Sequence, residues 1–291
     1  MPSPILALDR RATDPALLTR RAQPLLGTIV EIAVDPAHEA SIDVAFQAIR
    51  YVHARMSFHD EASDLAALAH ATHGETITID PATVIVLRAA LELHEQSGGL
   101  FDVTIGRELV RARFLPRGNI SHLSSYGGTS ADIEIVDDSH IRLARRVLID
   151  LGGIAKGYAV DMAVAALRRD GADYGIVNAG GDLRLFGHAD IPVSVRCGGG
   201  GYAALPALRN CAVASSENSR TRHRIDGQMR TPHIGQGREP VVIDDTVTVI
   251  ADTCMIADAL TKVAMTDLEL ADRILADHKG FVVPKYLVES A

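Results

Sequence analysis

The feature that most constrains the fold is one stretch, residues 148–187, in which two Gly-Gly pairs separate a helix from strands. Its sequence is LIDLGGIAKGYAVDMAVAALRRDGADYGIVNAGGDLRLFG. A short strand precedes the first pair, and the residues after it predict a helix from Ala155 to Arg169. The segments YGIVNA and DLRLFG, on either side of Gly180 and Gly181, predict two further strands. A chain with this stretch combines a single helix with neighbouring strands joined by a tight turn.

The rest of the chain predicts helices and strands in the same mixed order. The expected helices cover 41–57, a short piece of 57–72, 81–97, a segment from 254 and a last helix near the end. The expected strands cover 27–34, 75–80, 131–136, 140–144, 192–214 around the tetraglycine turn Gly198–Gly201, 246–251 and a last strand. Because hairpins alternate with single helices, the pattern predicts an α+β fold with mixed or antiparallel sheets and packed helices.

Length and composition predict one large two-lobed domain. The chain has 291 residues, of which 47% are hydrophobic and 23% charged, without a low-complexity tract, so disorder is excluded. Residues 1–23 are polar and rich in arginine, which predicts an arm ahead of a single domain over residues 24–291.

Charge and composition exclude several classes of function. A net charge of -8, an aromatic content of 4% and no tryptophan argue against nucleic-acid binding, which needs a basic face or stacking side chains. Three widely spaced cysteines do not form a disulfide framework. We interpret them as buried thiols. Without a signal peptide or an apolar run of about 18 residues, the sequence predicts a cytoplasmic protein with no membrane span.

The glycines at the start of the helix in this stretch predict an anion site. Gly152, Gly153 and Gly157 lack Cβ atoms, so backbone amides can approach a pyrophosphate that the helix dipole also favours. Lys156 lies in the first turn, where a cation is disfavoured unless an anion compensates it. The alternatives are a purely structural turn and a solvent-exposed lysine. The string GGIAKG is neither the Rossmann fingerprint nor a phosphate-binding P-loop.

Several linked motifs resemble the ApbE family. They are DLGGIAKGYAVD and VNAGGDLRLFG, joined in order by PLLGTIVEI, SFHDEASDLAAL, GGLFDVTIG, CAVASS, TPHIG and VTVIADTCMIADALTKVAM, and together they run from about residue 24 to residue 268. The resemblance implies an ApbE-like two-lobed fold and an activity that splits FAD, attaches its FMN half to a Thr or Ser of an acceptor protein and releases AMP.

The resemblance also implies the residues of the site. Those that line or shape the FAD site, together with Gly152 from the glycine turn, are Thr28, Ser57, Asp102, Thr104, Gly153, Lys156, Asp161, Asn178, Gly180, Gly181 and Asp182. His233 resembles a histidine with an acid/base or orienting role near the flavin diphosphate. Ala155, Asp258 and Thr261 are the implied Mg²⁺ ligands, and a hard cation suits the charge that develops on phosphoryl oxygens.

The sequence departs from the family pattern around these last residues. The family's DALxT places a threonine one turn after the aspartate, whereas here Thr261 comes one residue early and Lys262 takes the threonine's place. Residues i and i+4 share a helix face, so Lys262 is expected beside Asp258. The lysine either supplies an ammonium where the metal would lie or weakens metal binding by repulsion.

Two further departures lie in neighbouring motifs. The chain has HIGQGREP where the family has HIIDPRTG, and Ser215, Ser216 and Glu217 replace the family's TSG. These changes leave three hypotheses: a Mg²⁺-dependent FMN transferase with His233, Asp258 and Lys262 in catalytic roles, an FAD carrier or sensor without catalysis, and an FAD pyrophosphate hydrolase.

Overall fold

The described chain divides into two compact units. The computed structural model describes residues 18–120, 122–197 and 201–284. Unit 1 comprises the described parts of 1–51, 156–217 and 244–291, and unit 2 comprises those of 52–155 and 218–243. Residues 1–17 of the predicted arm and residues 198–200 of the predicted tetraglycine turn lie outside the described residues. The expectation of a single domain over 24–291 stays a prediction.

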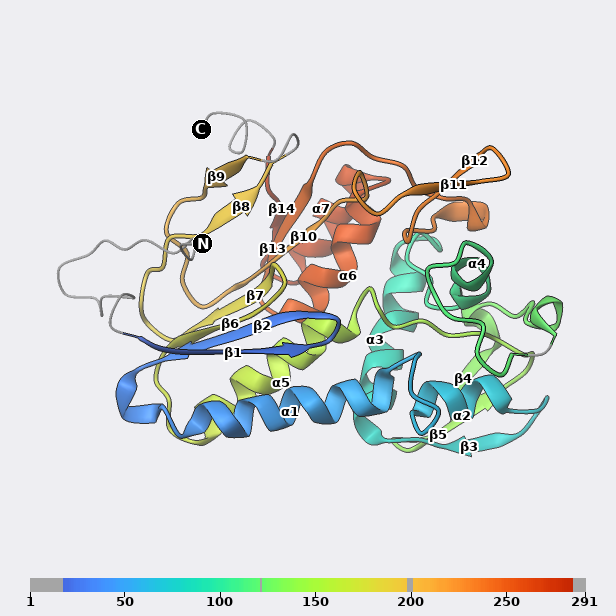
Figure 1. Cartoon of the computed structure of the whole chain (residues 1–291), viewed down its shortest axis with the longest axis horizontal. Coiled ribbons are helices and arrows are strands. Elements are labelled where there is room, and N and C mark those ends of the chain that lie inside the picture. Colours follow the sequence, from blue (N-terminus) through green and yellow to red (C-terminus); the bar gives the residue numbers. More distant parts are fainter. Residues whose placement is uncertain (1–17, 121, 198–200, 285–291) are drawn as a thin grey trace. The chain divides into compact units, whose positions relative to one another are not determined.

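Unit 1 is built on a seven-stranded sheet in which each strand pairs antiparallel with its neighbours (Figure 1). In spatial order the strands are β1 (Thr19–Leu25), β2 (Thr28–Val34), β6 (Gly175–Ala179), β7 (Asp182–Phe186), β10 (Ala212–Ser216), β13 (Val247–Ala251) and β14 (Phe281–Val282). The hairpin predicted around the second Gly-Gly pair is β6–β7, with Ala179 opposite Asp182. This register brings Asp182 to the first position after the turn.

Strand β1 was not expected, because residues 19–23 were assigned to the arm. The strand lies at the edge of the sheet and pairs only with β2, and none of its residues is buried, so its sequence shows no apolar pattern. Arg20 forms an ion pair at 2.8 Å with Glu31 on β2. The edge position thus explains how an Arg-rich segment forms a strand.

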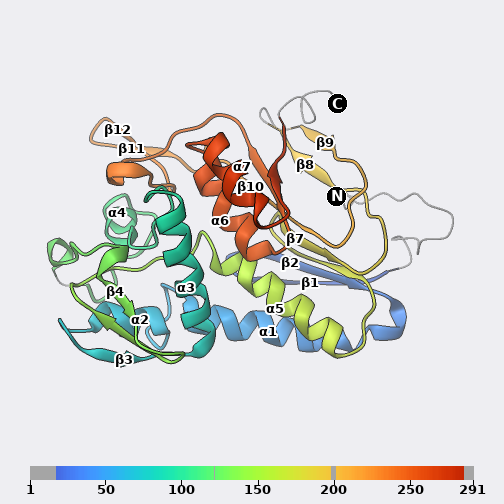
Figure 2. The same cartoon turned by 180° about the vertical axis from the view of Figure 1, so that it is seen from behind.

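Four helices of unit 1 pack against this sheet. They are α1 (Ser41–Met56), α5 (Ala155–Arg169), α6 (Cys254–Ala264) and α7 (Leu268–Ala276). Figures 1 and 2 show α1 and α5 side by side along β1, β2 and β6. The predicted apolar face of α1 is buried, since Ile42, Phe46 and Ile49 are 0% exposed. Each such side chain contributes on the order of 2 kcal/mol through burial.

A second apolar cluster covers part of the sheet of unit 1 together with the hairpin of β8 (Ser194–Arg196) and β9 (Tyr202–Ala204). It includes Ile176 and Leu185, which pair across β6 and β7, and Val195 and Val213. Cys254 is buried as expected, whereas Cys197 and Cys211 are only partly buried, which corrects the expectation of three buried thiols.

Unit 2 contains short helices and a small antiparallel sheet. The helices are α2 (Asp64–His70), α3 (Pro81–Gln96) and α4 (Gly106–Arg111), the sheet is β3 (Thr76–Thr78), β5 (His140–Leu143) and β4 (Ile133–Ile135), and a separate hairpin is β11 (His223–Ile225) with β12 (Gln228–Arg230). Short 3-10 helices in the two units cover Pro36–His38, Leu123–Ser125, Ser130–Asp132 and Gln236–Arg238.

Local signals in the sequence explain where the helices of unit 2 begin. The Ser63 hydroxyl accepts a hydrogen bond from the Ala66 amide at 3.1 Å and caps α2. Pro81 is the first residue of α3, where its missing N–H costs nothing.

The antiparallel sheets and single helices of the two units confirm the predicted α+β class. Among the described residues, no helix is both long and apolar enough to cross a membrane.

Candidate functional site

Helix α5 begins directly after the first Gly-Gly pair, as predicted. The amides of Ile154 and Ala155 bond to the Leu151 carbonyl at 3.0 and 2.8 Å and close the turn that contains Gly152 and Gly153. Gly152 is exposed. In the first turn of α5 the Gly157 amide donates to the Asp258 carboxylate, so the helix start already holds one anionic group.

Lys156, the second residue of α5, lies in unit 1 between two carboxylates. Its ammonium donates to Asp182 on β7 and to Oδ2 of Asp258 on α6, the latter at 3.3 Å. Burial lowers the pKa of the Lys156 ammonium, but the two carboxylates outweigh this effect and raise the pKa above its ordinary value. Burial and the charge of Asp258 raise the pKa of the Asp182 carboxyl. The lysine is therefore a charged group held in place, with 31% of its side chain exposed.

Asp258 is the centre of this cluster and is completely buried. Its Oδ2 also accepts from the Gly157 amide at 3.2 Å, and its Oδ1 accepts from the Lys262 ammonium. Lys262 donates in addition to the Asp258 main-chain oxygen at 2.9 Å, so the predicted pairing along one helix face is confirmed. Burial raises the pKa of the Asp258 carboxyl. The charges of Lys156 and Lys262 lower this pKa by a larger amount, so it lies below its ordinary value.

The backbone of α5 closely approaches the start of α6. A Cβ atom at Gly157 would overlap the carbonyl oxygen of Cys254, so only glycine fits there. Four residues later, Asp161 accepts from the amides of Cys254 and Met255, both at 2.9 Å, and pairs with Arg184. Burial raises the pKa of the Asp161 carboxyl against the lowering effect of Arg184. Asp161, expected to line or shape an FAD site, caps α6.

The second Gly-Gly pair forms the tight turn between β6 and β7. Gly180 and Gly181 have φ angles of 68° and 110°, which L residues rarely adopt. The Gly181 amide donates to Oδ1 of Asn178 at 2.9 Å. A Cβ at Gly180 would overlap the Thr28 hydroxyl, so Thr28 lies directly against the turn. These four predicted residues together position Asp182.

A cavity of about 300 Å³ lies on the other face of β7 within unit 1. Successive side chains of a strand point to opposite faces. Leu183 and Leu185 line the cavity, whereas Asp182 and Arg184 contact α5. Gly180, Gly181 and Asn178 also line it, so the β6–β7 turn separates the cavity from the lysine cluster.

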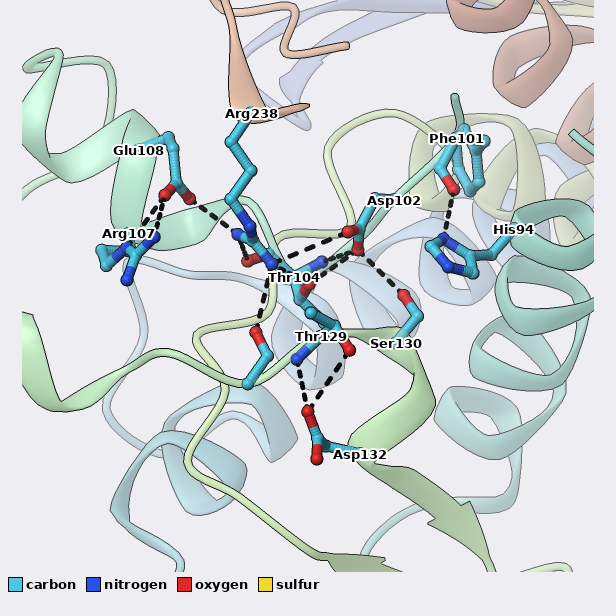
Figure 3. A network of polar contacts seen from close by, with 11 residues as sticks. His94, Phe101, Asp102, Thr104, Arg107, Glu108, Thr129, Ser130, Asp132 and Arg238 are labelled. Carbon is cyan, nitrogen blue, oxygen red and sulfur yellow. Dashed lines mark hydrogen bonds and ion pairs between the residues drawn. The ribbon is translucent and has the colours of Figure 1, made fainter. Parts of the chain in front are cut away.

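The predicted residues Asp102 and Thr104 belong to a polar network in unit 2 (Figure 3). The Thr104 amide and hydroxyl both donate to Oδ1 of Asp102 at 2.7 Å, and the Ser130 hydroxyl donates to the same atom at 2.8 Å. Ser57, also in unit 2, accepts from the His59 amide at 3.2 Å.

The sequence analysis missed Arg238, which anchors the HIGQGREP segment in this network (Figure 3). Its Nη1 donates to the Thr104 carbonyl at 2.8 Å and to Glu108 at 2.9 Å. Its Nη2 donates to the Thr104 hydroxyl at 2.9 Å and to the Gly128 carbonyl at 3.1 Å. Asp102 lies 3.7 Å from Nη2. The family pattern HIIDPRTG has an arginine at the position of Arg238, and this match could have identified the residue from the sequence.

His233 lies in the same segment, whose two ends are tied together. The buried Asn218 amide donates to the Val241 carbonyl at 2.7 Å and accepts from the Ile243 amide at 3.1 Å. The Thr231 hydroxyl donates to the His233 carbonyl at 2.8 Å. The loop that carries the imidazole is therefore fixed at its base.

The residues present do not fit a divalent cation at Asp258. Nitrogen donors already occupy both carboxylate oxygens. The buried Thr261 hydroxyl donates to the Asp258 carbonyl and bonds to the Ser216 hydroxyl, both at 2.7 Å. Ala155, the first residue of α5, is buried, and its amide donates to the Leu151 carbonyl. Within the described ranges, no three His, Cys, Asp or Glu side chains gather so that they could hold a metal ion.

Comparison with known proteins matches this fold and these motifs to one family. The family model described as "ApbE family" matches residues 26–282, and the chain therefore belongs to the ApbE family. A protein of Vibrio cholerae serotype O1 named FAD:protein FMN transferase is 25% identical over 227 residues, which cover 72% of this chain and 68% of that protein.

Solved structures show the same fold. The crystal structure of the ApbE protein from Thermotoga maritima superposes with a TM-score of 0.77 at 25% identity and covers 94% of this chain and 95% of that one. The apo form of Pseudomonas stutzeri flavinyl transferase ApbE gives a TM-score of 0.77 at 21% identity, with 88% of each chain covered. The predicted ApbE-like α+β fold is confirmed.

Proposed function

We propose that this chain transfers FMN from FAD to a Thr or Ser hydroxyl of an acceptor protein and releases AMP. Membership of the ApbE family and the name FAD:protein FMN transferase carried by its relatives support the proposal. The structural observation that carries it is the Lys156 ammonium, held partly exposed in the first turn of α5 by Asp182 and Asp258.

The electrostatics of this position favour a diphosphate. An ammonium in the first turn of a helix lies at the positive end of the dipole, which is unfavourable without an anion; here Asp182 and Asp258 compensate it and keep it charged and in place. Among the contacts of the described residues, Lys156 donates to two carboxylates, so one N–H of its ammonium remains for a ligand. The FAD diphosphate offers the negative oxygens that both the lysine and the helix start favour.

The cavity next to the β6–β7 turn is the proposed seat for one ring system of FAD. Its volume of about 300 Å³ is at the lower end of ligand pockets, and the apolar side chains of Ile176, Leu183 and Leu185 contribute to its lining. Asn178 and Ser215 add polar groups that can orient a ring. The diphosphate of the same molecule would then pass the turn toward Lys156.

The proposed reaction is a displacement at the phosphorus of the FMN half. The acceptor oxygen forms a bond to this phosphorus, the bond from phosphorus to the bridging oxygen breaks, and AMP leaves with that oxygen. The acceptor hydroxyl must lose its proton, and we assign this proton to the His233 imidazole, because histidine is the side chain that most often takes up protons in catalysis.

The test is incubation of the purified chain with FAD and a protein extract, followed by denaturing electrophoresis and chromatography. Transfer predicts flavin fluorescence in an acceptor band together with an equal amount of AMP. AMP with free FMN would identify a hydrolase, and bound but intact FAD would identify a carrier. The Lys156→Met variant is expected to lose the covalent product, whereas Lys279→Met, at an exposed lysine, should retain it.

A further inference from the structure

The use of lysine in this chain is unusual. The sequence has only four lysines, Lys156, Lys262, Lys279 and Lys285, and arginine supplies its other basic side chains. Two of the four lysines contact the same carboxylate, that of Asp258. An ammonium is a compact point charge, unlike the planar guanidinium, so a lysine can stand close to a carboxylate where a small cation would otherwise bind.

Lys262 has the contacts that a cation at this position would have. Its ammonium touches both a carboxylate oxygen and the main-chain oxygen of Asp258. Carboxylate and carbonyl oxygens are also the ligands that Mg²⁺ prefers. The Lys262 side chain is 18% exposed and is therefore only partly buried.

The charges of the cluster are already balanced without a metal. Two ammonium groups, Lys156 and Lys262, face two carboxylates, Asp182 and Asp258. A divalent ion would add two positive charges beside two existing ones in a mostly buried place, where repulsion is screened little. The Thr261 hydroxyl already has two hydrogen-bond partners, the Ser216 hydroxyl and the Asp258 main-chain oxygen.

We propose that Lys262 is a built-in cation that stands at Asp258 in place of a divalent metal ion, so that this chain acts on FAD without one. The inference rests on the proposed function. Lys262 forms no covalent bond in the transfer. Its charge, fixed in position by Asp258, offsets the negative charge that develops on the phosphoryl oxygens and on AMP.

The first experiment measures binding of Mn²⁺ to the purified chain without FAD, by electron paramagnetic resonance of the unbound ion. The wild type is expected to bind no Mn²⁺ at Asp258. In the Lys262→Thr variant the charge is gone and a hydroxyl replaces it, so Mn²⁺ affinity should rise on the order of tenfold or more. The matched control Lys279→Thr removes one positive charge elsewhere in unit 1 and should behave as the wild type.

The second experiment measures AMP release from FAD in EDTA and in Mg²⁺. The wild type should release AMP equally in both, and Lys262→Thr should release it only with Mg²⁺. Tight Mn²⁺ binding by the wild type, or loss of its AMP release in EDTA, would overturn the inference. A Lys262→Thr protein that is folded by circular dichroism and still binds no Mn²⁺ would also overturn it.

The two readouts separate this inference from the proposed function. If the wild type cuts no FAD under any condition, the transferase proposal fails, while the Mn²⁺ titration still tests the role of Lys262. If Lys262→Thr does not fold, Lys262→Met keeps the length of the side chain and serves as the uncharged variant, with loss of AMP release in EDTA as its expected result. The wild-type titration needs no variant at all.

Discussion

The two polar networks of this protein use their cations in different ways. In unit 2, the four Nη–H donors of Arg238 all have acceptors, supplied by Thr104, Glu108 and Gly128. In unit 1, the ammonium of Lys156 bonds to two carboxylates and is 31% exposed. The Nη–H donors of Arg238 are thus all bonded within unit 2, whereas Lys156 keeps one N–H donor and a partly exposed side chain that a ligand can contact.

This difference is the one expected between a structural network and a binding site. A guanidinium whose four Nη–H donors are bonded inside the protein stabilises a loop and offers none of them to a substrate. An ammonium between fixed carboxylates keeps its charge and its position but can add another partner. We therefore expect changes in the Arg238 network to act on stability, and changes at Lys156 to act on FAD.

The largest effect on stability is expected at Gly157, whose main-chain amide donates to Asp258 in the lysine cluster of unit 1. Gly157→Ala places a methyl group against the Cys254 carbonyl and should move the amide that bonds to Asp258. We expect a loss of about 3 kcal/mol in the free energy of unfolding, measured by urea denaturation. Gly201→Ala, where an added Cβ meets no atom within 4 Å, is the control and should change stability by less than about 0.5 kcal/mol.

The next effect tests whether Arg238 is structural. Arg238→Met leaves Asp102 without Arg238 and removes one of the two arginines that pair with Glu108, which keeps Arg107, and since Arg238 is 22% exposed we expect a loss of about 2 kcal/mol in the free energy of unfolding. Arg224→Met, at an exposed arginine with a single bond to Gly227, should cost less than about 0.5 kcal/mol. Equal effects of the two substitutions would remove the contrast between the networks.

A smaller effect in free energy is expected for the lysine that we assign to binding. Lys156→Met should weaken FAD binding about tenfold, equivalent to about 1.4 kcal/mol, as measured by quenching of flavin fluorescence. In this variant Asp258 keeps Lys262 as a partner. Asp182 loses its ammonium, but burial and Asp258 already raise the pKa of its carboxyl, so it can take up a proton, and the free energy of unfolding should fall less than in Arg238→Met. Unchanged FAD affinity would show that Lys156 is as structural as Arg238.

The local parts of these networks could be predicted from sequence. The bounds of α5, the turn at Gly180 and Gly181, and the approach of Lys262 to Asp258 all follow from residue types and spacings within a few positions. Helix periodicity and the conformational freedom of glycine act over such distances.

The long-range parts could not be predicted in this way. Arg238 meets Thr104 across 134 residues of sequence, and Lys156 meets Asp258 across 102. No local pattern encodes such pairings, because the packing of whole elements brings them about. The resemblance to a family named Asp258 and Lys156 separately, but their direct contact, which leaves no open carboxylate oxygen for a metal, required the structure.

The smallest effects are pH-dependent and should have opposite signs at the two carboxylates of the cluster. Lys156 and Lys262 lower the pKa of Asp258, so below the ordinary pKa the unfolded state holds more protons there and stability falls as the pH falls. Burial and the charge of Asp258 raise the pKa of Asp182, so the folded state holds more protons there and stability falls as the pH rises from the ordinary value to the raised one.

Two variants separate these opposing slopes. The stability advantage of the wild type over Asp258→Asn should shrink as the pH falls below the ordinary pKa of an aspartate, and that over Asp182→Asn should shrink as the pH rises above it. Urea denaturation at a series of pH values measures both. Slopes of the same sign would mean that the balance between burial and neighbouring charges is the same at the two carboxylates, and Asp258 would not then be the one that Lys156 and Lys262 keep charged.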